Sequence, residues 1–231
     1  MEATLRAIAR MESDFPDKFG IPRQAGLVEA LVGRVVFEPE FRSEDALRGI
    51  EAFSHLWLIW QFSETLREGW SPTVRPPRLG GNERMGVFAT RSPFRPNGLG
   101  LSCVRLLGVE RGGGRGPVLL VAGADLMDGT PIFDIKPYLP YADAKSDARG
   151  GFAPAAEQPL RVEIAPGALD RFPADKRAAL LGVLAQDPRP RYQKDPSRVY
   201  ALRFAGFEVR FAADGEALRL LSAERSDPGS P

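Results

Sequence analysis

The 231-residue sequence contains one cysteine and one histidine, Cys103 and His55. A disulfide framework within the chain is therefore excluded, and the usual zinc site built from several cysteine and histidine ligands cannot form. Basic and acidic residues nearly balance, with 31 Lys and Arg against 30 Asp and Glu. This balance excludes a globally basic nucleic-acid-binding chain, so any basic surface must be local. The sequence shows no cluster of carboxylates that suggests another kind of metal site, and we expect no bound metal.

Long apolar segments and the common nucleotide-binding and nucleophile motifs are also missing. No apolar run approaches 18 residues, so we expect no membrane span. The first 15 residues carry acids and lack an apolar segment, so we predict no secretory signal and a cytoplasmic protein. GxGxxG after a strand, GxxxxGK[ST] and GxSxG do not occur, which argues against a Rossmann site, a P-loop and a nucleophile elbow. His55 is then the only possible base of a serine–histidine triad, or a half-buried residue that begins a strand.

Turn-forming residues are abundant, with 24 glycines and 21 prolines spread along the chain. They predict many turns and argue against a helical bundle. A short helix is expected at 44–50, with Ser43 as its N-cap. Because strand-like runs dominate and helices do not alternate with them, the sequence predicts a mainly β fold, a barrel or a sandwich. The strand-like runs lie near the start of the chain and at 33–39, 54–62, 84–91, 102–111, 117–127 and 131–138.

The composition changes near residue 145, where a segment rich in alanine, glycine and proline predicts a linker. After it we expect a strand at 160–166, a helix at 173–187 and three short strands with turns at 205–206 and 214–215. The sequence therefore predicts two domains, a β domain over 1–145 and a small α+β domain over 158–224.

Residues 75–105 contain six arginines and one acidic residue, Glu83, which gives this stretch a net charge of +5. Guanidinium groups suit planar anions such as phosphate and carboxylate. The prolines and glycines between the arginines favour a rigid binding loop. A solvated loop with scattered surface ion pairs explains the composition about equally well.

A second polar group follows the turn signature at 128–131. Asp134, Lys136 and Tyr138 are spaced by two, which places them on one face of a strand. An acid, a base and a phenol on one face can form an active-site wall. The alternative is an exposed strand with an Asp–Lys pair of little energetic value.

Taken together, several longer motifs resemble the TrmO family, also called TsaA-like. The motifs are GIPRQ at 20–24, FSHLWLIWQF at 53–62, VRPPRLGGNERMGVFATRSPFRPNGLGLS at 74–102, DLMDGTPIFDIKPYLPYAD at 125–143 and DPRPRY at 187–192. The resemblance is strong over residues 4–143 and weaker over 160–211. It implies a β-barrel N-terminal domain that binds S-adenosylmethionine without a Rossmann fold, and a smaller α+β C-terminal domain. It also implies a homodimer with cofactor sites near the subunit interface.

The reaction implied by the resemblance is methylation of N6 of threonylcarbamoyladenosine, beside the anticodon of threonine tRNA. One departure from the family is Ser63, where many members carry a second histidine. Two other readings stay open: a methyltransferase acting on another RNA or a small molecule, and a non-catalytic regulator that binds RNA or S-adenosylmethionine.

Candidate residues fall into three groups. The resemblance assigns cofactor contacts to Pro22, Arg23, Gln24, His55, Leu56, Arg91, Leu101, Asp128, Gly129, Thr130 and Pro131. For catalysis we predict Asp134 or Asp143 as the base that takes the N6 proton, Tyr138 as a relay, and Lys136 with Arg95 against the substrate's carboxylate. For RNA we predict Arg75, Arg78, Arg84, Phe94, Arg95, Arg189, Arg191, Tyr192 and Lys194.

Overall fold

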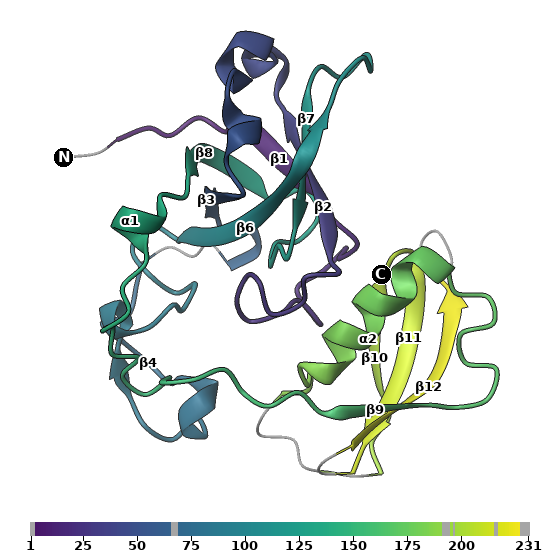
Figure 1. Cartoon of the computed structure of the whole chain (residues 1–231). Helices are drawn as coiled ribbons and strands as arrows, with labels where there is room; N and C mark the ends of the chain where they lie inside the picture. Colours follow the sequence, from purple (N-terminus) through teal and green to yellow (C-terminus); the bar gives the residue numbers. More distant parts are fainter. Residues whose placement is uncertain (1–2, 66–68, 191–194, 196, 215–216, 227–231) are drawn as a thin grey trace.

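The computed structural model describes residues 3–65, 69–190, 195, 197–214 and 217–226. Six strands form a closed barrel in the order β1-β2-β7-β6-β3-β8 (Figure 1), and every neighbouring pair is antiparallel. This confirms the predicted barrel. Its strands are β1 (Ala9–Glu12), β2 (Val32–Phe37), β3 (His55–Gln61), β6 (Leu99–Glu110), β7 (Val118–Ala122) and β8 (Pro131–Pro137).

Strand β3 shows how the sequence pattern builds the barrel. Leu56, Leu58 and Trp60 are buried inside, and the residues between them lie half-exposed on the outer face. Alternate side chains of a strand point to opposite faces, so this run has one apolar face for the barrel core. The ring of Trp60 crosses β6 at Gly100, where a Cβ atom would lie 2.3 Å from the indole. Gly100 is therefore the gap in β6 that accommodates this ring.

A second unit contains a four-stranded sheet in the order β10-β11-β12-β9, with β9 parallel to β12. Helix α2 packs against this sheet through Leu180 and Leu184, which belong to the unit's core. The predicted order of strand, helix and three strands is confirmed. The elements are β9 (Arg161–Ile164), α2 (Arg177–Ala185), β10 (Tyr200–Phe204), β11 (Phe207–Ala213) and β12 (Ala217–Arg225).

The chain between β1 and β2 leaves the barrel and packs into the core of the second unit. Phe15, Val28 and Leu31 are buried there, and the ring centroids of Phe15 and Phe204 lie 5.2 Å apart. This segment carries residues 20–24, so the predicted cofactor loop contacts both units. Local sequence patterns did not predict this packing.

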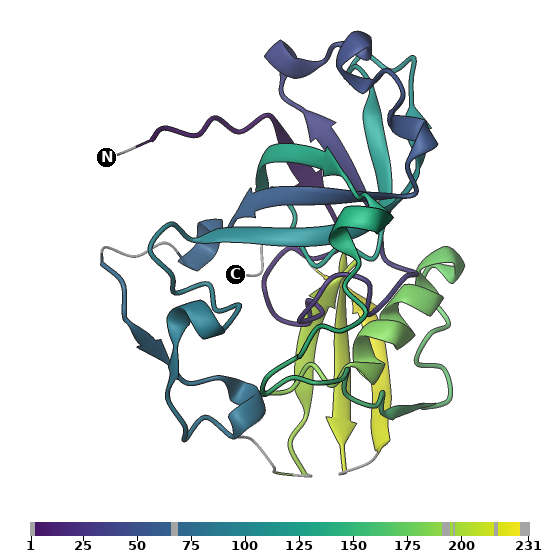
Figure 2. The ribbon, with the colours of Figure 1, turned by 60° about the vertical axis from the view of Figure 1, so that its left-hand side comes forward.

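Residues 69–98 form an arm that extends from the barrel and stands beside the second unit (Figure 2). Its strands are β4 (Thr73–Val74) and β5 (Met85–Gly86). The predicted strand at 84–91 is wrong beyond residue 86, because the chain turns into a 3₁₀ turn at Val87–Ala89. The remaining 3₁₀ turns are Pro39–Phe41, Glu44–Leu47, Ile50–Ala52, Ser63–Thr65, Pro77–Leu79 and Ala174–Lys176.

The helix predicted at 44–50 is also wrong in type and length. The structure has a 3₁₀ turn over Glu44–Leu47, and the Ser43 side chain makes no capping hydrogen bond. Gly49 follows with a φ of 86°, a left-handed conformation that ends the helical path and favours glycine. One further helical turn, α1 (Pro140–Asp143), follows β8.

Candidate cofactor and RNA-binding site

Three segments that are distant in the sequence meet beside the barrel. The Arg91 guanidinium donates a hydrogen bond to Oε1 of Gln24. The N–H of Ala25 donates to the carboxylate of Asp125, and Gly26 N donates to Gly123 O at 2.8 Å. The loop at 20–24, the arm and the segment after β7 thus form one polar cluster. Two of the predicted cofactor residues, Gln24 and Arg91, are brought into contact here.

Asp125 is largely buried at this junction and lies at the end of a hydrogen-bonded chain. Trp60 Nε1 donates to Ser102 Oγ at 2.9 Å, and Ser102 Oγ donates to Asp125 Oδ1 at 2.5 Å. Burial raises the pKa of Asp125, and the hydrogen bonds and the positive charge of Arg91 offset only part of that rise. Sequence reasoning missed Asp125, although a carboxylate three residues beyond the buried strand β7 was a signal.

The turn at 128–131 lies next to this cluster. Asp128 accepts a hydrogen bond from Ser13 N at 3.0 Å, and Thr130 Oγ1 donates to Met127 O at 2.7 Å. Thr130 is buried, and Gly129 adopts a φ of 75°, which favours glycine. The Thr130 hydroxyl therefore fixes the shape of the turn.

His55 and Leu56 lie away from this cluster. The cluster contacts β3 near Trp60, and His55 is five residues away along that strand, about 16 Å at the usual rise. The side chain of Leu56 is fully buried in the barrel, so a ligand could meet only its backbone. One copy of the chain does not bring these two residues together with Gln24 and Arg91.

Three of the predicted site residues surround Trp57 at the His55 end of β3. The Tyr138 ring lies 6.1 Å from His55 and 5.9 Å from Trp57, measured between ring centroids. Asp143 Oδ2 accepts hydrogen bonds from Leu139 N at 2.8 Å and Trp57 Nε1 at 3.1 Å. These bonds lower the pKa of Asp143, which makes it a weak proton acceptor.

Asp134 and Lys136 share the outer face of β8, as their spacing predicted. Lys136 Nζ lies 3.3 Å from Asp134 Oδ2. In the sheet, Lys136 is opposite Trp57 and Asp134 is opposite Ile59. The predicted catalytic residues thus follow one strip of the outer barrel face. Leu101, opposite Ile59 in β6, is 55% exposed and makes this face partly apolar.

The predicted RNA-binding arginines differ in how strongly the structure holds them. Arg84 donates to Thr73 Oγ1 at 3.4 Å on the arm. Arg189 is paired with Asp187 at 2.7 Å with little exposure, which leaves it poorly placed to contact RNA. Arg191, Tyr192 and Lys194 lie outside the described residues. The other predicted RNA contacts in the described part of the chain are Arg75, Arg78, Phe94 and Arg95, of which Arg78 pairs with Glu157 at 3.5 Å.

Sequence reasoning missed an aromatic pair on the arm. Trp70 and Phe88 are 53% and 71% exposed, with ring centroids 5.9 Å apart. Trp70 precedes β4 and Phe88 follows β5, so both flank the short hairpin that carries Arg84. Exposed aromatic rings next to cations are typical of surfaces that stack unpaired bases.

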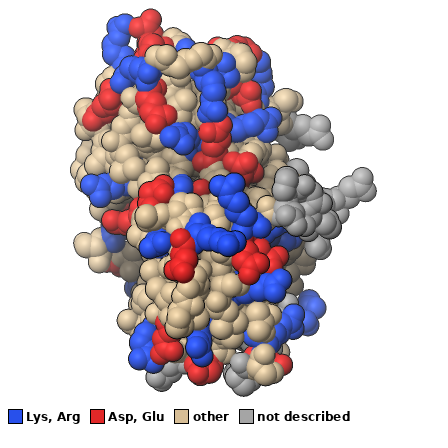
Figure 3. Space-filling model, turned by 90° about the vertical axis from the view of Figure 1, so that its right-hand side faces the viewer, with Lys and Arg blue, Asp and Glu red and all other residues tan. Residues whose placement is uncertain are grey.

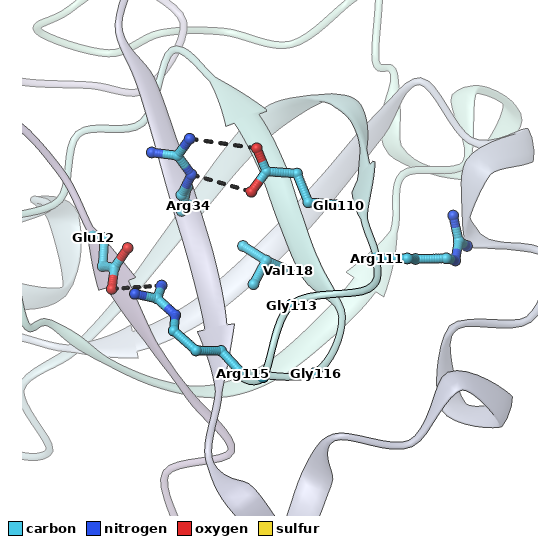
Figure 4. A pocket seen from close by; sticks show the side chains of 9 residues that line it. Glu12, Arg34, Glu110, Arg111, Gly113, Arg115, Gly116 and Val118 are labelled. Atoms are coloured by element: carbon cyan, nitrogen blue, oxygen red, sulfur yellow. Dashed lines mark hydrogen bonds and ion pairs between the residues drawn. The ribbon is translucent and has the colours of Figure 1, made fainter.

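A pocket on the β6–β7 hairpin lies apart from these residues (Figure 4). Arg34 pairs with Glu110 at 3.3 Å and Arg115 with Glu12 at 2.8 Å, so its charges neutralise one another. The face in Figure 3 likewise mixes basic and acidic side chains without a continuous basic area. Within the described residues, no group of three or more Asp, Glu, His or Cys side chains is arranged to hold a metal ion. None of the helices in those ranges is long and apolar enough to cross a membrane.

Both units of the chain match known protein families. Residues 10–144 match the tRNA-methyltransferase O N-terminal domain, and residues 156–226 match the TrmO C-terminal domain. A tRNA (adenine(37)-N6)-methyltransferase of Escherichia coli is 43% identical over 227 residues, 94% of this chain and 96% of that protein. A putative S-adenosylmethionine-dependent methyltransferase of Pseudomonas aeruginosa is 43% identical over 219 residues, covering 91% and 93%. The crystal structure of TrmO from Pseudomonas aeruginosa superposes with a TM-score of 0.79 at 36% identity, covering 96% and 98%. The chain therefore belongs to the TrmO family.

Proposed function

We propose that this protein methylates N6 of adenine 37 in threonine tRNA, when that adenine carries a threonylcarbamoyl group, with S-adenosylmethionine as methyl donor. The observation that carries the proposal is the cluster of Gln24, Arg91 and Asp125 beside the 128–131 turn. The names of the relatives support a tRNA adenine substrate. The threonylcarbamoyl group and the threonine tRNA follow from the motif resemblance.

The residues of this cluster fit the proposed cofactor. S-adenosylmethionine supplies an electrophilic methyl group, and its methionine part carries one carboxylate and one ammonium. Arg91 offers a cation and Asp125 a largely buried carboxylate within one cluster, so both charges of an amino acid find a partner. The other proposed contacts are Pro22, Arg23, Leu101, Asp128, Gly129, Thr130 and Pro131, with His55 and Leu56 considered below.

For the proton on N6 we propose Asp134 as acceptor. The pKa of Asp143 is lowered by its bonds to Leu139 and Trp57, so Asp143 holds the indole in place more readily than it takes a proton. Lys136, beside Asp134, pairs with the carboxylate of the substrate's threonyl group. Tyr138 relays the proton from Asp134 to solvent.

We further propose a homodimer that completes the cofactor site. The outer face of β3 and β6 exposes Leu101 and Leu107, at 55% and 48%. Burying this face against a second copy removes apolar surface from water. His55 and Leu56, which are separated from Arg91 within one copy, then reach the cluster of the other copy.

The tRNA is proposed to contact the arm and the second unit. Residues 1–145 hold the cofactor and catalytic groups, and residues 158–224 add a secondary RNA contact. On the arm, Arg75 and Arg84 contact tRNA phosphates, so tRNA affinity falls steeply as the salt concentration rises. Such a substrate places the protein's action in the cytoplasm.

The test is mass analysis of nucleosides after incubation with S-adenosylmethionine and threonine tRNA, with and without the threonylcarbamoyl group. A gain of one methyl on the modified nucleoside alone is expected. Methylation of unmodified tRNA or another RNA would overturn the proposed substrate. Cofactor binding without methyl transfer would favour a non-catalytic regulator. In single-turnover assays, Asp134→Asn should slow methylation strongly, whereas the exposed Asp45→Asn should not.

A further inference from the structure

A carboxylate of the linker between α1 and β9 lies between two arginines from different parts of the chain. Arg23 belongs to the loop at 20–24 and Arg78 to the arm. Glu157 lies in the linker, which runs past the arm to β9 (Figure 1). Glu157 Oε2 is 4.0 Å from Arg23 Nη1, and Glu157 Oε1 is 3.5 Å from Arg78 Nε. Each oxygen of this carboxylate therefore faces one guanidinium, as in an anion that two arginines share.

The linker makes a second contact with the arm at the same place. Arg78 Nη2 donates a hydrogen bond to the main-chain oxygen of Ala155, two residues before Glu157. The side chains of Arg78 and Glu157 are 31% and 43% exposed, so water reaches both. Exposed ion pairs contribute little to stability. Another anion can therefore replace the linker carboxylate at small cost.

The charges around Glu157 favour an anion at its position. Burial lowers the pKa of Arg23 and the nearby charge of Arg78 lowers it further, whereas Asp187 raises it. Asp187 is itself paired with Arg189 at 2.7 Å, so its charge is shared between two arginines. Two guanidiniums that repel each other are stabilised by a negative group between them, and guanidinium groups suit phosphate as well as carboxylate.

Resting on the proposed RNA substrate, we propose that Arg23 and Arg78 form a phosphate-binding site, which Glu157 occupies when the linker lies against the arm. A phosphodiester group of the RNA replaces the Glu157 carboxylate, so the linker competes with RNA for this site. The arm carries five arginines and one acidic residue, Glu83. A polyanion that enters the site therefore meets further cations along the arm, which a small carboxylate does not reach.

The experiment measures the RNA affinity of the full-length protein by filter binding over a series of salt concentrations. The probes are a threonine tRNA transcript and an unrelated RNA hairpin, because phosphate contacts carry no sequence information. Glu157→Gln should tighten the binding of both RNAs by about two- to fivefold, the size of an exposed ion pair. Glu163→Gln removes the same charge from an exposed ion pair with Arg161 and is the matched control. Its effect should be clearly smaller.

The arginine variants show whether the gain comes from this site. Arg78→Gln should weaken RNA binding and lower the slope of log affinity against log salt by about one. When Arg23→Gln and Arg78→Gln are combined, adding Glu157→Gln should give no more gain than adding Glu163→Gln. If the combined variant does not fold, Arg78→Gln alone provides the background, in which the gain should be reduced.

Equal gains from Glu157→Gln and Glu163→Gln would overturn the proposal, as would a gain that persists without the two arginines. Calorimetry with S-adenosylhomocysteine, the demethylated form of the proposed cofactor, gives the other source of an anion. If Glu157→Gln tightens this ligand and not RNA, the site binds the cofactor's carboxylate and the proposal is wrong. If the Glu157→Gln gain on RNA is found but no tRNA is methylated, only the proposed function fails. If methylation is found without that gain, only the phosphate site fails.

Discussion

Lys176 Nζ lies 2.6 Å from Asp14 Oδ2 and joins the second unit to the loop that leads to the predicted cofactor contacts at 20–24. Both side chains are partly buried, at 30% and 16% exposure. A second pair, Arg203 with Asp17 at 2.9 Å, holds the same loop. The α+β unit therefore holds the segment that carries Pro22 and Gln24, so we expect changes in this unit to affect cofactor binding.

Removing this ion pair should weaken both stability and ligand binding. Lys176→Met leaves Asp14 partly buried without its cation, so the free energy of unfolding should fall by about 1–3 kcal/mol. The affinity for S-adenosylhomocysteine should fall with it, because the loop at 20–24 loses an anchor. Urea unfolding and calorimetry measure the two effects. The exposed pair of Arg161 and Glu163 provides the control, since Arg161→Met should change stability by less than about 1 kcal/mol.

Gly100→Ala should disrupt the barrel core locally. The added methyl group would lie 2.3 Å from the Trp60 indole, so the ring must move and its hydrogen bond to Ser102 must weaken. Overpacking of this kind costs about 1–3 kcal/mol. Thermal unfolding and the near-ultraviolet circular dichroism of tryptophan report the change. Gly108→Ala, in the same strand with open space at its Cβ, should leave both signals unaltered.

Asp125 and Asp143 should affect the pH dependence of stability with opposite signs. Burial raises the pKa of Asp125 above its ordinary value. The free energy of unfolding should therefore fall as pH rises from the ordinary pKa through the raised pKa of the folded protein. Hydrogen bonds lower the pKa of Asp143. Its contribution to the free energy of unfolding is therefore fully present above the ordinary Asp pKa, and it is lost as pH falls through the lowered pKa of the folded protein.

At neutral pH, Asp125→Asn should therefore stabilise the protein and Asp143→Asn should destabilise it. At about pH 3, below the ordinary Asp pKa, the stability of each variant should lie closer to that of the unmodified protein. Urea unfolding at the two pH values measures them. A loss of stability in Asp125→Asn at neutral pH would contradict the expected cost of the buried charge.

The aromatic pair on the arm should contribute to RNA binding without stabilising the fold. Trp70→Ala and Phe88→Ala each remove an exposed ring, so the free energy of unfolding should change little. The affinity for threonine tRNA should fall by an amount that corresponds to about 1–3 kcal/mol per lost stacking contact. Filter binding at fixed salt measures this. Leu5→Ala removes a comparably exposed apolar side chain outside the arm and should leave RNA affinity unchanged.

Cys103 should report on the proposed dimer. It lies opposite Trp57 on the outer barrel face, and burial followed by the charge of Asp143 raises the pKa of its thiol. Reaction with a thiol reagent should therefore be slow at neutral pH. If this face joins two copies, the reaction should slow further as protein concentration rises. A rate that does not depend on concentration, together with a dimer in sedimentation, would place the interface elsewhere.

The strand pattern predicted a mainly β fold and the order of elements in the second unit, and the motif resemblance predicted the family and with it the barrel. The alternation of Leu56, Leu58 and Trp60 sets one face of β3 toward a core, and this local pattern is readable without a structure. The spacing of Asp134 and Lys136 likewise placed both on one face. In the arm, the local pattern predicted a strand at 84–91, but the chain leaves the strand after Gly86 and forms a 3₁₀ turn at Val87–Ala89.

Which of these residues meet depends on tertiary contacts that no local pattern predicts. Asp125 accepts hydrogen bonds from Ser102, 23 residues away in sequence, and from Ala25, directly after the loop at 20–24. That loop is held by Lys176, 162 residues from Asp14. Such contacts depend on strand register and on how two units pack, and no local periodicity encodes them. The same geometry separates His55 from Arg91 within one copy, because the length of β3 lies between His55 and the cluster at Trp60.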